Sequence, residues 1–220
     1  MFKVIRNEDA PASLANRRSY SEQDVLDALS RVFHKKCYIC ETKEPIDINV
    51  EHFEPHLGDI DKKFDWENLY FSCGRCNNIK LARYNDLLDC CDSNVDVLRL
   101  IKHVPPITPY AKCLRIEPQC DDEKTKLTAE LIEKVFNSTH TPNKTVSASF
   151  LRKRVFQQFN LFLDLQREYF DELTLPAEKE TALERMKLLI KASSQYCAFI
   201  SWCVLDDDEL APLLDEYIGA

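Results

Sequence analysis

CYICETKEPIDINVEHFEPHLGDIDKKFDWENLYFSCGRCNNIK, residues 37–80, is the stretch that decides the fold of this 220-residue chain. A CxxC pair stands at each end of it, Cys37 with Cys40 and Cys73 with Cys76. Each pair can form a tight turn that offers two thiolates to a tetrahedral ion at about 2.3 Å. Two pairs complete a closed site with no position for substrate, so we expect structural zinc. The alternative is a redox pair of the thioredoxin type, which needs a βαβ context that is absent here.

The residues between the cysteine pairs predict two strands and a helix. Apolar and polar residues alternate over 46–53, which is typical of a strand. The charges, proline and glycine of 54–67 predict a loop. A short β-like run at 69–71 follows, and 77–83 fits the opening of a helix.

Three side chains in this stretch suit metal binding and proton transfer. Glu51 and Asn77 offer oxygen ligands, which a hard divalent cation such as Mg²⁺ prefers. Zinc prefers the thiolates, so ligand softness can sort two different metals in one small module. His52 is the side chain best able to take a proton from water near pH 7.

Residues 35–85 resemble the HNH endonucleases, a family with a ββα-metal fold that is here set between two zinc-binding turns. The family has a His at the end of its first strand, an Asn in the following loop, and a His or Asn on the helix. His52, Asn68 and Asn77 stand at these positions. Glu51 replaces the Asp that usually precedes the first His. The ending Cys-Asn-x-x-Lys, which closes on Lys80, is also similar to the family.

The resemblance implies a role for each of these residues. His52 is expected to be the general base that deprotonates the attacking water. Glu51 and Asn77 are expected to hold one Mg²⁺ or Mn²⁺, and Asn68 to fix the loop and help orient His52. The ion is expected to stabilise the leaving 3′-oxygen as a Lewis acid.

Three further residues are candidates for contact with a phosphate group. Lys80 lies on nearly the same predicted helix face as Asn77 and could meet a phosphate, and Arg75 is a weaker candidate. His56, four residues beyond His52, is expected to be a solvated loop residue.

A narrower resemblance rests on Glu-His-Phe-x-Pro, Trp-x-Asn-Leu and Cys-x-x-Cys-Asn-x-x-Lys. Together with a helical tail, these motifs resemble the PtuB-like nuclease subunit of Septu-type and retron-associated anti-phage systems. That resemblance implies an effector subunit, acting on DNA in preference to RNA, that works with an ABC/SMC-like ATPase.

The whole chain is expected to be α+β, with an N-terminal ββα-metal module and a mainly α-helical domain after it. We expect the nuclease module at 1–92, a Pro-rich connection at 93–120 and a partner-binding helical domain at 121–220. Helices are predicted over residues 21–34 with Ser21 as N-cap, 127–136, 145–173 and 178–204, with a short one after 206–209.

The charge balance bounds the possible partners. The chain has 29 Lys and Arg against 37 Asp and Glu, a net charge of −8. Phosphate affinity comes mostly from Lys and Arg, so an acidic chain needs a local basic cleft or a basic partner to bind nucleic acid. No apolar run is long enough for a membrane span. The first residues also lack a signal-peptide pattern, so we expect a cytoplasmic location with reduced cysteines.

Two other functions remain open at this point. The same site could act as a ribonuclease, for example on tRNA, because the motif does not distinguish the sugar. A non-catalytic zinc-ribbon adaptor is the other alternative, although an adaptor has no need of Glu51, His52 and Asn77 together.

Overall fold

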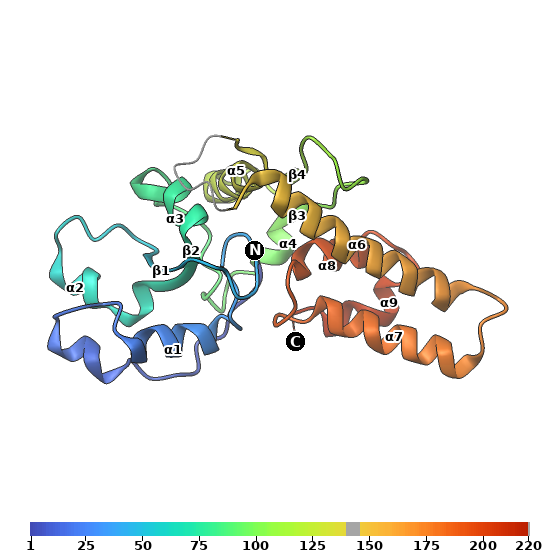
Figure 1. The fold of residues 1–220 in the computed structure, drawn as a ribbon, viewed down its shortest axis with the longest axis horizontal. Coiled ribbons are helices and arrows are strands. Elements are labelled where there is room, and N and C mark those ends of the chain that lie inside the picture. The colour runs from blue at the N-terminus through green and yellow to red at the C-terminus, as the bar shows by residue number, and fades with distance from the viewer. Residues whose placement is uncertain (140–145, 220) are drawn as a thin grey trace.

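A short hairpin and one helix surround the paired cysteines. The computed structural model describes residues 1–139 and 146–219. In it, β1 (Ile48–His52) pairs antiparallel with β2 (Leu69–Cys73), and α3 (Gly74–Lys80) follows β2 directly (Figure 1). All five side chains of β2 are buried, as its apolar composition predicts, whereas β1 buries only Glu51. The two predicted strands and the helix after them are therefore present, with α3 beginning at Gly74 rather than at Asn77.

The segment between β1 and β2 is more ordered than a loop. It contains the short helix α2 (Ile60–Phe64) and a 3₁₀ turn over Trp66–Asn68. The Asp59 carboxylate caps α2 by accepting hydrogen bonds from the amides of Asp61 and Lys62. A helix of this length shows no apolar periodicity, which is why the prediction of a plain loop over 54–67 was wrong.

Helix α1 (Gln23–Val32) packs against β2 and lies below the first hairpin in Figure 1. Val25, Leu29 and Val32 are buried, as the helical spacing predicts. The prediction of Ser21 as N-cap was wrong, because Glu22 occupies that position. The Asp24 side chain is held from outside the helix, where Ser13 donates to it.

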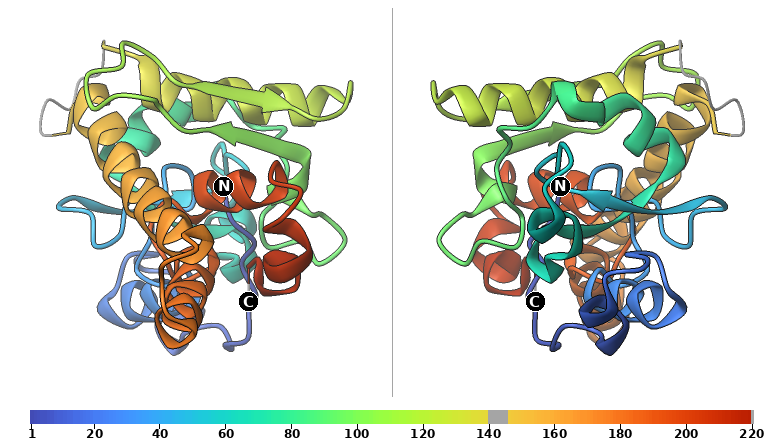
Figure 2. Two further views of the ribbon diagram at one scale, coloured as in Figure 1. Left: turned by 90° about the vertical axis from the view of Figure 1, so that its right-hand side faces the viewer. Right: turned by 90° about the vertical axis from the view of Figure 1, so that its left-hand side faces the viewer.

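The Pro-rich segment is more than a connection. It forms α4 (Val97–Leu100) and a second antiparallel hairpin, β3 (Ile101–Val104) with β4 (Arg115–Pro118). The hairpin packs between α5 (Glu123–Asn137) and α8 (Cys197–Leu205), as Figure 2 shows. Pro118 ends β4, where a missing amide costs no ladder hydrogen bond.

Long helices make up the rest of the chain. α6 (Ala148–Phe170) and α7 (Pro176–Ile190) form an antiparallel pair that extends away from the first hairpin, and we call this pair the arm (Figure 1). α6 corresponds to the helix predicted over 145–173, of which residue 145 lies outside the described part of the chain. α9 (Ala211–Leu214) is the short final helix.

The single helix predicted over 178–204 was wrong. The chain leaves the helix after Ile190 and starts again at Cys197, with Tyr196 in a left-handed conformation at φ +56°. Both halves, α7 and α8, bury apolar residues against α6, so the apolar pattern runs on across the break.

Two hydrophobic cores support these elements. The larger one joins side chains from both ends of the chain, among them Phe33, Tyr70, Val155 and Phe199. A smaller core lies among α6, α7, α8 and α9. The boundaries predicted at 92 and 120 therefore do not divide the main core. Among the described residues, no helix has the length and apolarity that a membrane crossing requires.

Candidate metal centre and active site

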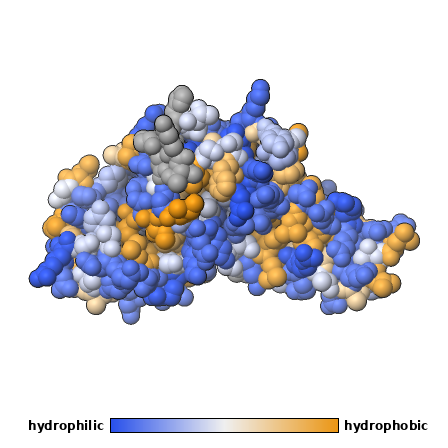
Figure 3. All heavy atoms as spheres, viewed as in Figure 1, coloured by the Kyte–Doolittle hydropathy of each residue, from blue (hydrophilic) through white to orange (hydrophobic). Residues whose placement is uncertain are grey.

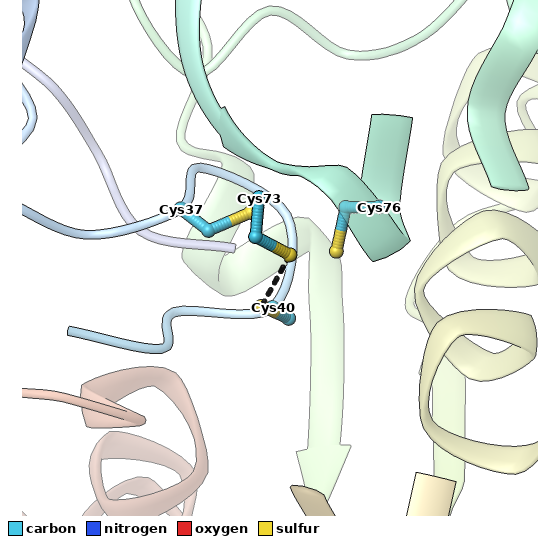
Figure 4. A group of neighbouring side chains, drawn as sticks. All are labelled: Cys37, Cys40, Cys73 and Cys76. Atoms are coloured by element: carbon cyan, nitrogen blue, oxygen red, sulfur yellow. Dashed lines mark hydrogen bonds between the residues drawn. The ribbon is translucent and has the colours of Figure 1, made fainter. Parts of the chain in front are cut away.

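The four cysteines converge on one point (Figure 4). Their Sγ atoms all lie within 4.8 Å of one another, and Cys40 Sγ is 3.8 Å from Cys73 Sγ. A tetrahedral ion with thiolates at about 2.3 Å places the sulfurs about 3.8 Å apart. All four residues are buried. The predicted four-cysteine cluster is confirmed, and it could hold a structural metal ion such as zinc.

The cluster fastens three elements together. Cys37 and Cys40 come from the turn after α1, Cys73 ends β2, and Cys76 lies in the first turn of α3. Burial, with the neighbouring thiols, raises the pKa of Cys76 well above its ordinary value. The thiolate of Cys76 is therefore costly on its own, and a cation that binds it removes that cost.

A pocket of about 360 Å³ brings together three of the four residues predicted for catalysis, whereas the fourth, Asn68, lines a different pocket. Glu51 and His52 reach it from β1, and Asn77 reaches it from α3. Tyr20 and His56 also line it. The predicted general base and both predicted metal ligands therefore meet in one cavity.

A hydrogen bond to a backbone carbonyl defines the tautomer of His52. Its Nε2 lies 3.0 Å from the carbonyl oxygen of Lys63, and a carbonyl can only accept, so Nε2 donates. The neutral ring then carries its lone pair on Nδ1. The Tyr20 ring contacts the imidazole edge-on with centroids 4.7 Å apart. Burial lowers the pKa of His52 below its ordinary 6.5, although the hydrogen bond to the Lys63 carbonyl acts in the opposite direction. His52 is thus neutral and able to accept a proton at pH 7.

Asn68 acts on the loop that carries the partner of His52. Its Nδ2 donates to the carbonyls of Glu54 at 2.9 Å and Lys62 at 3.0 Å, and its Oδ1 accepts from the Glu54 amide at 2.7 Å. Lys62 immediately precedes Lys63, whose carbonyl accepts the hydrogen bond from His52 Nε2. The geometry matches a residue that fixes the loop and orients His52.

Lys80 does not face solvent. Its side chain is fully buried, and Nζ lies 2.9 Å from Glu51 Oε1. It also donates to the carbonyls of His52 and Phe53. The Lys80 ammonium donates to three internal acceptors, so the predicted phosphate contact of Lys80 does not fit the structure.

Arg75 is buried as well. Its guanidinium donates to the carbonyls of Val135, Ser138 and Val146, which belong to the end of α5 and the approach to α6. Arg75 therefore joins α3 to the end of α5 and the approach to α6, and the predicted phosphate contact does not fit this position.

The donors beside His52 fit a hard divalent cation. Glu51 gives one carboxylate oxygen to Lys80 and retains the other, and burial raises the Glu51 pKa despite that ion pair. Asn77 directs its amide nitrogen to Asn49 Oδ1 at 3.5 Å, which leaves Asn77 Oδ1 available. Two oxygen ligands beside room for water and a phosphate are what Mg²⁺ typically takes from a protein.

The sequence analysis missed Tyr20 as a lining residue and expected His56 to be solvated. Tyr20 lies before α1, far along the chain from His52, and no motif includes it. His56 offered a signal in its spacing of four residues from His52, but a spacing within a loop does not say which way a side chain turns.

Neither the comparison with protein-family models nor that with curated proteins finds a match for this chain.

Proposed function

We propose that this protein is a metal-dependent HNH-type endonuclease that hydrolyses phosphodiester bonds, with DNA as the favoured substrate. One observation carries the proposal. His52, oriented by the Lys63 carbonyl, shares a single pocket with Glu51 and Asn77 on a ββα unit.

The chain's own residues account for the proton transfer and the alignment. His52 Nδ1 takes a proton from a water molecule, whose oxygen attacks the phosphorus while the bond to the 3′-oxygen breaks. Asn68 keeps the loop, and with it the Lys63 carbonyl, in place for this step. Lys80 favours the ionised carboxylate of Glu51 against burial. Glu51 and Asn77 would hold Mg²⁺ or Mn²⁺, which supplies a Lewis acid for the phosphate.

Substrate capture is proposed to depend on a partner. Among the described residues, no Lys or Arg lines the pocket, and the whole chain has a net charge of −8. Figure 3 shows apolar residues exposed over the arm. The exposed large apolar residues of the arm and of the loop that joins its two helices are Phe150, Leu163, Phe170, Leu173, Leu175 and Leu188. These features support a protein partner, for which we propose the ABC/SMC-like ATPase of an anti-phage complex.

A cleavage assay tests the proposal. Wild type and His52→Ala are incubated with Mg²⁺ or Mn²⁺ on plasmid DNA and on total RNA, alone and with the proposed ATPase. His34→Ala is the matched control, because His34 is exposed and lies outside the pocket. We expect metal-dependent cleavage of DNA by wild type and His34→Ala, and a loss of about 10²–10⁴-fold in His52→Ala.

Each other result has a defined meaning. Cleavage of RNA alone would assign a ribonuclease instead. If the wild type cleaves neither substrate while zinc is bound and the ATPase is associated, the non-catalytic zinc-ribbon adaptor is the remaining alternative.

A further inference from the structure

His56 belongs to the candidate active site rather than to the solvated surface. Its ring centroid lies 4.8 Å from that of His52, with the two planes inclined at 58°. It is half-buried and lines the same pocket as Glu51 and Asn77. The expectation of a freely solvated loop histidine was therefore wrong.

The local backbone fixes the tautomer of His56. The Gly58 amide donates to Nδ1 at 3.2 Å, and an amide can only donate, so Nδ1 is an acceptor and the proton of the neutral ring is on Nε2. The Asp59 amide also donates to the His56 carbonyl at 2.7 Å, which closes the turn. Gly58 has φ +93°, a conformation that side chains rarely adopt. The turn and the ring orientation are thus built together.

The two histidines have opposite hydrogen-bonding roles toward the backbone. His52 donates through Nε2 to a carbonyl and keeps a lone pair on Nδ1. His56 accepts at Nδ1 and keeps an N–H on Nε2. One ring therefore offers an acceptor and the other a donor. Because the Nδ1 of His56 is already occupied, His56 is the poorer base of the two.

A phosphodiester in this pocket needs donors from somewhere other than basic side chains. Lys80 and Arg75 are bound to internal partners, and no Lys or Arg lines the pocket in the described part of the chain. Negative charge grows on the non-bridging oxygens as water attacks. A donor already in place for that charge lowers the barrier without reorganisation.

We propose that His56 is a catalytic residue whose Nε2–H donates to a non-bridging oxygen of the scissile phosphodiester. This assignment rests on the proposed function. His56 keeps its proton throughout, and the proton released by water goes to His52.

Side-chain replacement at His56 tests the role directly. The amide nitrogen of a Gln side chain can lie near the Nε2 position and donate, whereas Ala offers no donor. With the wild type cleaving, we expect kcat to fall about 10²-fold in His56→Ala and to recover most of that loss in His56→Gln, with KM little changed. His34→Gln is the matched control for the chemical change, and thermal unfolding confirms that each variant is folded.

The outcomes separate the two proposals. Cleavage by His56→Ala at the wild-type rate, or equal losses in His56→Ala and His56→Gln, would overturn the role of His56 and leave the nuclease standing. An inactive wild type would overturn the nuclease itself.

A spectroscopic readout is independent of activity. Nitrogen-15 NMR of the histidine rings should show His56 as the Nε2–H tautomer, with its signal identified by its absence in His56→Gln. We expect inorganic phosphate to shift that signal more than the signal of His34. An Nδ1–H tautomer, or no response to phosphate, would contradict the assignment.

Discussion

Lys80 and Glu51 form a buried ion pair, Nζ to Oε1 2.9 Å, that joins the last residue of α3 to β1. The same ammonium binds the carbonyls of His52 and Phe53. One cation thus holds the end of the strand that presents His52. A buried pair of this kind contributes little over apolar packing, but removing one partner leaves an uncompensated charge.

Lys80→Met should destabilise the fold by about 3–5 kcal/mol, measured by urea unfolding near neutral pH. Burial already holds the Glu51 pKa above its ordinary 4.5, and losing Lys80 raises it further. A carboxyl whose folded pKa is raised stabilises the fold below its unfolded pKa and loses that contribution as pH rises. The variant should therefore lose stability as pH rises from about 4.5.

The double variant Lys80→Met/Glu51→Gln is the control, since it removes the stranded charge. It should recover part of the loss and most of the pH dependence. A single variant within about 1 kcal/mol of wild type would contradict the account.

The cysteine cluster predicts a bound metal on which folding depends. The purified protein should contain about one zinc per chain, and Cys76→Ser should lose it. Structural zinc contributes about 10–16 kcal/mol of apparent binding free energy, as much as the stability of a typical domain or more. Elemental analysis and circular dichroism before and after chelation measure both effects. Cys113→Ser, at an exposed cysteine, should change neither. Zinc retained at the wild-type level in Cys76→Ser would contradict the assignment.

Cleavage should persist to mildly acidic pH. A histidine acts as a general base only when it is deprotonated, so activity falls as pH drops through its pKa, and burial places the His52 pKa below 6.5. We expect a plateau in kcat/KM at neutral pH and an acid limb centred below 6.5, with a limiting slope of about tenfold per pH unit. Rates between pH 4.5 and 8 at saturating metal check this. An acid limb centred above 7 would be inconsistent with His52 as the base.

Asn68→Asp removes the hydrogen bonds that the Asn68 side chain donates and keeps the one that it accepts. Asp keeps an oxygen for the Glu54 amide but cannot donate to the carbonyls of Glu54 and Lys62. We expect a loss of about 1–3 kcal/mol in stability and a fall in kcat larger than the change in KM, because the loop that orients His52 loosens. Asn7→Asp, the same change at an exposed position, should affect neither. Unchanged kcat in Asn68→Asp would show that the loop does not control His52.

The sequence predicts the cysteine cluster and the grouping of Glu51, His52 and Asn77, because both follow from short-range spacing around one hairpin. It does not predict the fate of Arg75, whose carbonyl partners lie at the junction of α5 and α6. Whether a cation meets solvent or a buried carbonyl depends on packing between distant segments. The hairpin of β3 and β4 was missed for a related reason, since its four-residue strands are defined by pairing rather than by composition.

Arg75 connects the helix that carries Asn77 to the helical part of the protein. It stands on α3 two residues before Asn77, and its guanidinium is tied to backbone carbonyls at both sides of the α5–α6 junction. The same side chain therefore ties the first turn of α3, which lies next to Asn77, to the backbone from which the arm begins.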